Sequence, residues 1–272
     1  MKAAQSKPTV FLGGGRITGA LLAGLRLARY DRPIVVHDRH HSKLRQLHRE
    51  YGVAVEPDLL RAVERAHLLM ITVRPDEVRG LLQQIGDTSR GKINPKIAVS
   101  LAAGIPLAHL RGWMGNAVGW ARAMPSPVAR VGRGLTALSF GHDFPLKARL
   151  EVRDFFARVG AVLEIPERKF DAFSVTYSSS QGYHALAGLA EAAQTVGLDR
   201  RTALTAAAHA LGDGILAWRE GSATLDELLH EAATPGGIAA ATLASMDKSG
   251  YKRAVLRGLQ AGMKRARRYT KQ

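Results

Sequence analysis

A glycine-rich turn near the N-terminus constrains the fold of this chain more than any other feature. The segment 13–17 (GGGRI) follows the apolar run Thr9–Leu12 and opens an amphipathic stretch at residues 17–28. Glycine at the first position permits a tight strand-to-helix turn, and Gly15 lets a ligand approach the backbone without meeting a Cβ. Backbone N–H groups at the start of the helix then point at an anion. The pattern predicts a dinucleotide-binding turn made by Gly13, Gly14, Gly15, Arg16 and Ile17.

The N-terminal half alternates short apolar strands with amphipathic helices. We expect strands at residues 9–12, 34–37, 68–72, 96–100, 135–140 and 161–165. The helices between them include residues 17–28, 42–51, 58–65 and 76–84. This order requires parallel strands joined by right-handed helical crossovers, and the apolar strands suit a sheet with helices on both faces.

The C-terminal half has a different pattern. After Pro166 no strand pattern appears, and alanine is frequent. Helices are expected at residues 182–196, 199–220, 224–232, 238–248 and 250–268. Asp199 and Thr224 are candidate N-caps, and Thr224 forms a capping-box pattern with Glu227. We therefore predict an α/β Rossmann-type domain over residues 1–165 and an all-α domain over residues 166–272.

A charged cluster follows the second predicted strand. In NAD sites an acid at the position of Asp38 accepts a hydrogen bond from the ribose 2′-hydroxyl. Arg39 comes directly after it, and an arginine there pairs with the 2′-phosphate of NADP. We interpret Asp38 and Arg39 as ligands of the adenosine ribose. NADP is the expected cofactor, with NAD as the alternative.

The chain is strongly basic, with a formal net charge of +16, and part of this charge lies at its C-terminal end. A basic tail can bind nucleic acid by counterion release. No nucleic-acid-binding motif accompanies the charge, so we interpret it as the solvated, frayed end of a helix and expect no nucleic-acid partner. The residues concerned are Lys264, Arg265, Arg267, Arg268 and Lys271.

Composition excludes several other classes of protein. The chain has no cysteine, which rules out disulfides and thiolate chemistry. No His, Asp or Glu cluster has metal-ligand spacing, so no metal is expected. No apolar run approaches the ~20 residues that span a bilayer, and the first strand begins too early to leave room for a signal peptide. We therefore expect a cytoplasmic protein without a membrane segment.

Several later segments, taken together, match the motifs of one family. In chain order they read VRP at 73–75, SLAAG at 100–104, RAMPSP at 122–127 and TPGG at 234–237. With the glycine-rich turn, the chain resembles the pyrroline-5-carboxylate reductases, whose motifs run GxGNM, VKP, SxAAG, RxMPNTPA, SGSGPAY and SPGGTT. The resemblance spans essentially the whole chain. It implies a Rossmann-type domain followed by a helical domain that forms an interwoven homodimer, which in some members assembles further.

The resemblance also implies where the nicotinamide and the substrate lie. It places the nicotinamide at the turns after the fourth and fifth strands, here Thr72, Val73, Arg74, Pro75, Ala102, Ala103 and Gly104. It places the substrate against the turn before a helix in the second domain and beside the segment aligned with SGSGPAY, here Ser178, Ser179, Gly236, Gly237 and Ile238. Exposed N–H groups at Gly236 and Gly237 suit a carboxylate. By itself, a Pro-Gly-Gly segment would be interpreted as a plain interhelical turn.

The substrate motifs depart from the family more than the cofactor motifs do. Ile238 and Ala239 replace the two threonines of SPGGTT, and the second of these usually bonds the substrate nitrogen. Ser126 stands where the family has Asn-Thr. Candidate proton donors are therefore other hydroxyls, namely Tyr177, Tyr183 and Thr234. For each tyrosine the alternative is a packing residue whose hydroxyl is already bonded.

The expected function is NAD(P)H-dependent reduction of a cyclic imine, with pyrroline-5-carboxylate as substrate and proline as product. Two alternatives remain open: a related imine or carbonyl reductase with another substrate, and a regulatory protein that binds NADP without catalysis. β-Hydroxyacid dehydrogenases share the domain plan but need a lysine early in the helical domain. Lys169 is the only lysine between Lys147 and Lys248, and it precedes the long helix where that residue should lie.

Overall fold

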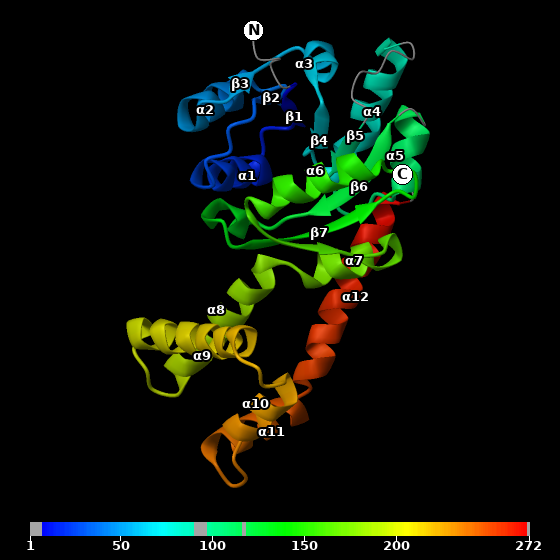
Figure 1. Ribbon diagram of the computed structural model, residues 1–272. Coiled ribbons are helices and arrows are strands. Elements are labelled where there is room, and N and C mark those ends of the chain that lie inside the picture. Colours follow the sequence, from blue (N-terminus) through cyan, green and yellow to red (C-terminus); the bar gives the residue numbers. More distant parts are fainter. Residues whose placement is uncertain (1–6, 90–96, 116–117, 271–272) are drawn as a thin grey trace. The chain divides into compact units, whose positions relative to one another are not determined.

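The computed structural model describes residues 7–89, 97–115 and 118–270. The chain forms two compact units (Figure 1). The first unit contains the residues up to Tyr177 and those from Gly262 onward. The second unit is Ser178–Ala261. The predicted domain boundary at residue 165 lies between the last strand and the helix that follows it, and it stays a prediction.

The first unit is built on a sheet that has eight strands within the described residues. They are β1 (Thr9–Leu12), β2 (Ile34–His37), β3 (Ala54–Val55), β4 (Leu68–Ile71), β5 (Ile97–Ser100), β6 (Gly119–Met124), β7 (Gly134–Phe140) and β8 (Gly160–Glu164). Their order is β3-β2-β1-β4-β5-β6-β7-β8, and only the β6–β7 pair of these strands is antiparallel. The chain winds outward from β1 to β3, then returns to the other side of β1 as β4. That reversal is the topological switch point at which α/β sheets bind ligands.

Helices cover both faces of this sheet (Figure 1). They are α1 (Arg16–Leu27), α2 (His41–Tyr51), α3 (Leu59–Arg65), α4 (Pro75–Ser89), α5 (Leu107–Met114), α6 (Leu146–Ala157) and α7 (Glu167–Thr176), with a 3-10 turn at Pro127–Val131. Alternate residues of a strand face opposite sides, so β1 sends Phe11 into a core with α1, α2 and α6. Val10 and Leu12 enter the other core, with α3, α4 and α5.

The second unit is helical throughout its length. It contains α8 (Ser179–Thr195), α9 (Arg200–Glu220), α10 (Leu225–Ala232), α11 (Ile238–Lys248) and the first part of α12 (Tyr251–Tyr269). Both predicted caps form: Asp199 accepts the N–H groups of Arg201 and Thr202, and Thr224 makes a complete capping box with Glu227. The predicted fold class, a Rossmann-type α/β domain and an all-α domain, is confirmed.

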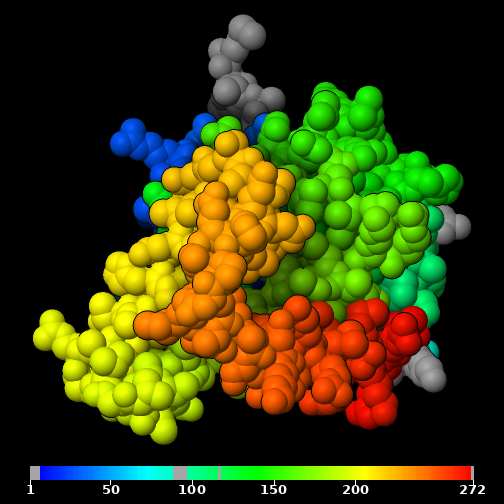
Figure 2. Space-filling model, turned by 90° about the horizontal axis from the view of Figure 1, so that it is seen from below, coloured from blue at the N-terminus to red at the C-terminus, as the bar shows by residue number. Residues whose placement is uncertain are grey.

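A single copy of the second unit buries few of its side chains. Its buried residues, among those described, are the small side chains of Ala190, Ala203 and Ala207. Large apolar side chains remain exposed on several helices, Ile215, Leu216 and Trp218 among them. Atoms of α9 to α11, yellow to orange, lie on the face shown in Figure 2. Exposed apolar surface of this extent is typical of an interface with another chain.

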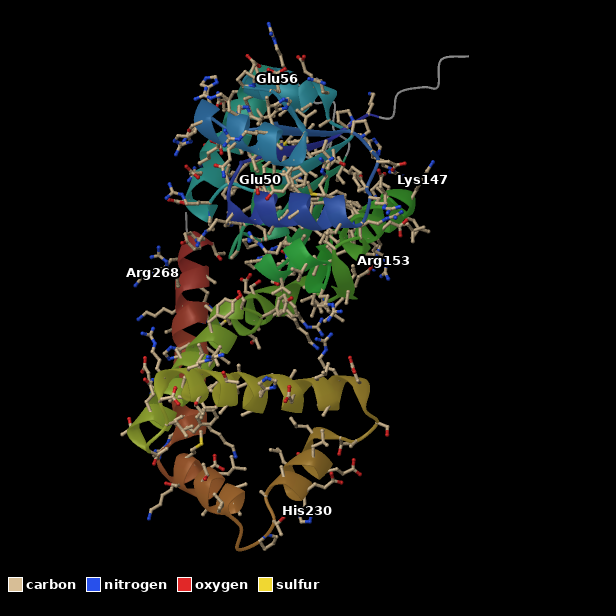
Figure 3. All side chains as sticks on the ribbon, turned by 90° about the vertical axis from the view of Figure 1, so that its left-hand side faces the viewer. Glu50, Glu56, Lys147, Arg153, His230 and Arg268 are labelled. Carbon is tan, nitrogen blue, oxygen red and sulfur yellow. The ribbon has the colours of Figure 1, made fainter. Side chains whose placement is uncertain are left out.

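The C-terminal end of α12 differs from the sequence prediction. The basic side chains are exposed as expected, and Arg268 projects outward from the helix (Figure 3). The helix end is not simply a solvated, frayed end, however, because Ala266 is only 7% exposed and the Thr270 hydroxyl donates to the Gly104 carbonyl within the first unit. The prediction of a frayed end was wrong because only one face of the helix is packed, through Ala266. A single alanine among so many basic residues does not produce an apolar pattern in the sequence. Lys271 lies outside the described residues.

The element predictions differ from the structure at a few places. The first residue of the strand predicted at 96–100 lies outside the described residues, and β5 is described from Ile97. Strands β3 and β6 and helices α5, α6 and α7 were not predicted. Among the described residues, no helix is long and apolar enough to cross a membrane.

Candidate cofactor and substrate sites

Four turns of the first unit meet at one edge of the sheet. Gly13 follows β1, Asp38 follows β2, Thr72 follows β4 and Leu101 follows β5. These four strands are adjacent and parallel, in the order β2-β1-β4-β5. Because parallel neighbours end at the same edge, the structure brings the predicted cofactor residues of the first unit together there.

The glycine-rich turn has the backbone that a pyrophosphate site needs. Gly13 has φ +118°, and a Cβ there would stand 2.9 Å from the backbone carbon of Thr72. Gly15 is the N-cap of α1, and a Cβ on it would meet nothing within 4 Å. The first N–H groups of a helix have no partner within it and favour an anion. The open space over Gly15 therefore lies where a phosphate would be bound.

Two threonine hydroxyls hold the glycine-rich turn against the end of β4, the strand beside β1. The Thr18 hydroxyl donates to the Gly13 carbonyl at 2.6 Å and lies 3.1 Å from the Thr72 hydroxyl. Thr72 in turn lies 2.9 Å from the Leu12 carbonyl oxygen and 2.8 Å from that of Gly13. Thr18 occupies the third glycine position of the fingerprint, and this bond explains why a threonine suits it. The Thr72 side chain faces the protein here, so a cofactor contact would fall to its backbone.

Asp38 is a buried carboxylate that is tied to the turn. Its side chain is 8% exposed, and it accepts the Gly14 N–H at 2.8 Å and the His40 N–H at 2.8 Å. Burial raises the pKa of Asp38, but these two N–H donors, the His40 ring and the charge of Lys43 outweigh it and hold the pKa below its ordinary value. The carboxylate is therefore ionised at neutral pH, the form that accepts a ribose hydroxyl.

Two arginines share one carboxylate beside this edge. Arg39 donates to Glu77 at 2.7 Å, and the Arg74 Nε lies 3.4 Å from the other oxygen of Glu77. Burial raises the pKa of Glu77, but Arg74 and Arg39 lower this pKa by more, so the net shift is downward. Arg74 also lies 3.9 Å from Asp76, so the two guanidinium groups face two carboxylates, and an extra phosphate would compete with Glu77 for Arg39.

The turn after β5 is fixed from inside the unit. The Ala102 N–H donates to the Ser100 hydroxyl at 3.3 Å, and Ala102 is buried. Gly104 has φ +74°, which favours glycine. The Leu107 N–H, at the start of α5, donates to Glu167 of α7 at 2.7 Å. The predicted nicotinamide turn therefore has a defined conformation.

Arg122 is a structural residue to which the sequence assigned no role. It lies in β6, is 1% exposed, and bonds Asp171 at 2.6 Å and Glu167 at 3.4 Å. Its guanidinium also stacks 4.3 Å from the Phe170 ring centre. Glu167 and Asp171 are four residues apart on one face of α7. The sequence signal that could have revealed this cluster has two parts: a single arginine in an otherwise apolar strand, and two acids four residues apart on a later helix.

The predicted substrate-binding residues all lie in the second unit. Gly237 is the N-cap of α11 and Gly236 has φ +80°. The Gly237 N–H donates to the Thr234 carbonyl at 2.9 Å, which makes a tight turn. Ile238 is the first residue of α11 and is 90% exposed. The turn therefore presents an exposed isoleucine, followed by an alanine, where the family motif has two threonines.

The remaining predicted residues have different surroundings. Ser178 is the N-cap of α8, its hydroxyl lies 2.7 Å from that of Ser180, and Ser179 begins the helix. Tyr183 is exposed on α8. Tyr177 belongs to the first unit, where its hydroxyl oxygen accepts the Leu135 N–H at 2.8 Å. In the described part of the chain no three His, Asp or Glu side chains gather as metal ligands.

Comparison with known proteins gives consistent results for the two halves. Residues 167–269 match the family described as pyrroline-5-carboxylate reductase dimerisation. Residues 9–104 match the family described as NADP oxidoreductase coenzyme F420-dependent. The helical half therefore matches a dimerisation domain, and the first part of the sheet unit, from β1 to the turn after β5, matches an NADP oxidoreductase domain.

Curated relatives and solved structures match along nearly the whole chain. The pyrroline-5-carboxylate reductase of Mycobacterium tuberculosis is 30% identical over 94% of each chain. That of Arabidopsis thaliana is 27% identical over 97% of this chain and 96% of its own. A Plasmodium falciparum pyrroline carboxylate reductase solved with NADP bound has a TM-score of 0.85 at 18% identity, over 98% of this chain and 99% of its own. One from Coxiella burnetii has a TM-score of 0.84 at 23% identity, over 98% and 100%.

Proposed function

Since the chain belongs to the pyrroline-5-carboxylate reductase family, we propose that it reduces pyrroline-5-carboxylate to proline with NAD(P)H. The observation that carries this proposal is the match to curated reductases over 94% of the chain. The carboxyl edge of the sheet supports it, because its turns have the geometry of a dinucleotide site.

The residues at the sheet edge fit a nicotinamide dinucleotide. Gly13, Gly14, Gly15, Arg16 and Ile17 would hold the pyrophosphate, Asp38 and Arg39 the adenosine ribose, and Thr72, Val73, Arg74, Pro75, Ala102, Ala103 and Gly104 the nicotinamide end. When bound, the dinucleotide supplies a hydride. The fit rests on the empty space over Gly15 and on the ionised, hydrogen-bonded carboxylate of Asp38.

The turn before α11 suits the substrate carboxylate. The Gly237 N–H, expected to be exposed, already donates to the Thr234 carbonyl, so the donors that remain are the Gly236 N–H and the first N–H groups of α11 from Ile238 onward. These groups and the positive end of this eleven-residue helix favour an anion. Ile238 adds an apolar side chain that would lie against a ring. Our proposed substrate ligands are Gly236, Gly237, Ile238, Ser178 and Ser179.

Reduction of C=N also requires a proton on the nitrogen. Ala239 has no hydroxyl, so this chain cannot use the second threonine of the family motif. A cyclic imine is fairly basic, and a hydroxyl or an ordered water can supply the proton. Thr234 and Tyr183, both exposed in the second unit, are proposed donors. Tyr177 is the weakest candidate, because its oxygen already accepts a backbone N–H, although its proton is still free to donate.

The dimerisation family and the exposed apolar helices support a homo-oligomer. We propose that a second copy of the chain covers Ile215, Leu216 and Trp218, as in an interwoven dimer. A cytoplasmic location stays a prediction.

The test is an assay of the purified full-length protein. Pyrroline-5-carboxylate is mixed with NADPH or NADH, the nicotinamide absorbance is followed, and proline is measured directly. Turnover above ~1 s⁻¹, an ordinary enzyme rate, supports the proposal. Tight NADPH binding with no proline formed would refute it and favour a binding protein without catalysis.

A second substrate is worth testing because of the altered turn at α11. Ile238 and Ala239 make this turn more apolar than SPGGTT. Another cyclic imine or a 2-oxo acid would fit such a turn without the missing hydroxyl. A panel of these compounds, compared with pyrroline-5-carboxylate by kcat/KM, decides between the two. The second candidate fails if pyrroline-5-carboxylate has the highest value.

A further inference from the structure

The last turn of α12 packs directly on the turn after β5. The Thr270 hydroxyl donates to the Gly104 carbonyl at 3.1 Å. A Cβ on Gly104 would stand 2.6 Å from the Ala266 carbonyl oxygen, so the two backbones are in close contact. Tyr269 lies between these residues in sequence and packs against the core on the α3–α5 side of the sheet. All of these residues belong to the first unit.

This contact completes the set of groups that hold the turn. Ser100 fixes its beginning through the Ala102 N–H, and Glu167 fixes the start of α5 through the Leu107 N–H. The Gly104 carbonyl lies between these two anchors, and Thr270 is the side chain that bonds it. Each of the three anchors therefore acts on a different part of the same short segment.

We propose that Ala266–Thr270 is a positioning element for the nicotinamide, with Thr270 as its positioning residue. The proposal rests on the proposed function, because it assumes that the nicotinamide lies on the turn Ala102–Gly104. Thr270 acts through the Gly104 carbonyl and does not itself touch the reacting atoms. Its role is to fix the distance between this turn and the nicotinamide ring.

The expected effect is on the reaction rather than on affinity. The pyrophosphate and ribose groups are held at Gly13, Gly15 and Asp38, which Thr270 does not contact. Hydride transfer depends steeply on geometry, since a displacement of about 1 Å can cost about 100-fold in rate. Loss of one hydrogen bond, with a partial shift of the turn, should reduce kcat by roughly 3- to 10-fold.

The experiment compares Thr270→Val with wild type in the full-length protein. Valine keeps the shape and removes the hydroxyl. We expect kcat to fall by roughly 3- to 10-fold, with the dissociation constant of NADPH changed less than about 2-fold. Thr270→Ser should recover most of the rate. Thr195→Val is the matched control, because the Thr195 hydroxyl bonds the Glu191 carbonyl within α8.

A second readout needs no substrate. The fluorescence of bound NADPH reports the surroundings of the nicotinamide, and it should differ between Thr270→Val and wild type at equal occupancy. If wild type fails to make proline, the proposed function fails, and this fluorescence still tests the positioning role. The proposal is overturned if Thr270→Val keeps wild-type fluorescence. It is equally overturned if NADPH affinity falls in proportion to kcat, or if serine does not restore the rate.

Discussion

The backbone N–H of Gly14 donates to Oδ2 of Asp38 at 2.8 Å, so the carboxylate after β2 supports the glycine-rich turn after β1. The other oxygen, Oδ1, accepts the N–H of His40. An ionised carboxylate has about four acceptor sites. The His40 ring and the Lys43 ammonium also face this carboxylate, at 2.9 Å and 3.5 Å, so a ribose hydroxyl would replace one of these two half-exposed partners while the N–H groups keep holding the turn.

Replacing Asp38 with asparagine should destabilise the protein by about 1–2 kcal/mol, because a hydrogen bond to a charged group is stronger than one to an amide. The measurement is the free energy of unfolding in urea at pH 7. Asp154→Asn, at an exposed position on α6, is the control and should change it by less than about 0.5 kcal/mol. Equal stabilities of the two variants would contradict the prediction.

The same substitution should change how stability depends on pH. The folded pKa of Asp38 lies below its unfolded value, so its ionised form stabilises the fold fully above about pH 4. That contribution is lost as the pH falls through the folded pKa. The stability difference between wild type and Asp38→Asn should therefore be full at pH 6 and shrink toward pH 3. A difference that is constant over this range would exclude the carboxylate as its cause.

Gly15→Ala should weaken NADPH binding by at least about 10-fold without unfolding the protein. Its φ is −82° and a Cβ there meets nothing within 4 Å, so the new methyl group fits the protein but occupies the expected phosphate space. Titration of NADPH fluorescence measures the affinity. Gly80→Ala on α4, which also has open space, is the matched control and should bind as wild type does. If both variants bind equally, the phosphate does not lie over Gly15.

Glu77→Gln should favour NADPH over NADH by roughly 2- to 5-fold in kcat/KM, as expected for an exposed ion pair worth up to ~1 kcal/mol. Removing the charge of Glu77 frees Arg39 to pair with a 2′-phosphate and leaves Arg74 with Asp76 as its carboxylate partner. Glu151→Gln is the control, because Glu151 also bonds two basic groups, Arg32 and His67. An unchanged ratio in Glu77→Gln would mean that the phosphate is bound elsewhere.

Trp218→Glu should shift the protein toward a smaller assembly. The side chain is 49% exposed in the single chain and lies in the matched dimerisation region. Burying an unpaired carboxylate between two copies costs several kcal/mol. Sedimentation over a range of concentrations measures the mass. Leu146→Glu, at an exposed leucine of the first unit, should leave the assembly intact; a loss in both variants would point to general instability.

The sequence predicted those elements whose signal is local. β1 and β2 have the predicted bounds, because each is an apolar run bounded by turn residues. β6 was not predicted because it begins with glycine and contains the charged residue Arg122. The burial of Arg122 depends on its acidic partners in α7, which comes two strands later in the chain. β3 is two residues long and carries almost no pattern.

The candidate site was predictable to the same extent. Gly13 and Asp38 follow recognisable strands, so their meeting at one edge follows from parallel order alone. The bond between Thr270 and Gly104 joins residues 166 positions apart and leaves no trace in either segment. Contacts of this kind depend on tertiary packing, which a periodicity argument cannot reach.

Residues 262–270 belong to the same unit as the sheet that begins at Thr9, although all of Ser178–Ala261 lies between this segment and the sheet in sequence. Ribosomes add about 5–20 residues per second, and domains near the N-terminus generally fold first. Here the sheet emerges from the ribosome before Ser178–Ala261, and the segment that packs on the Gly104 turn is translated after it. The contact with Gly104 can therefore form only when the whole helical unit has already been synthesised. A message that stops before the codon for Ala266 would yield a sheet without this contact.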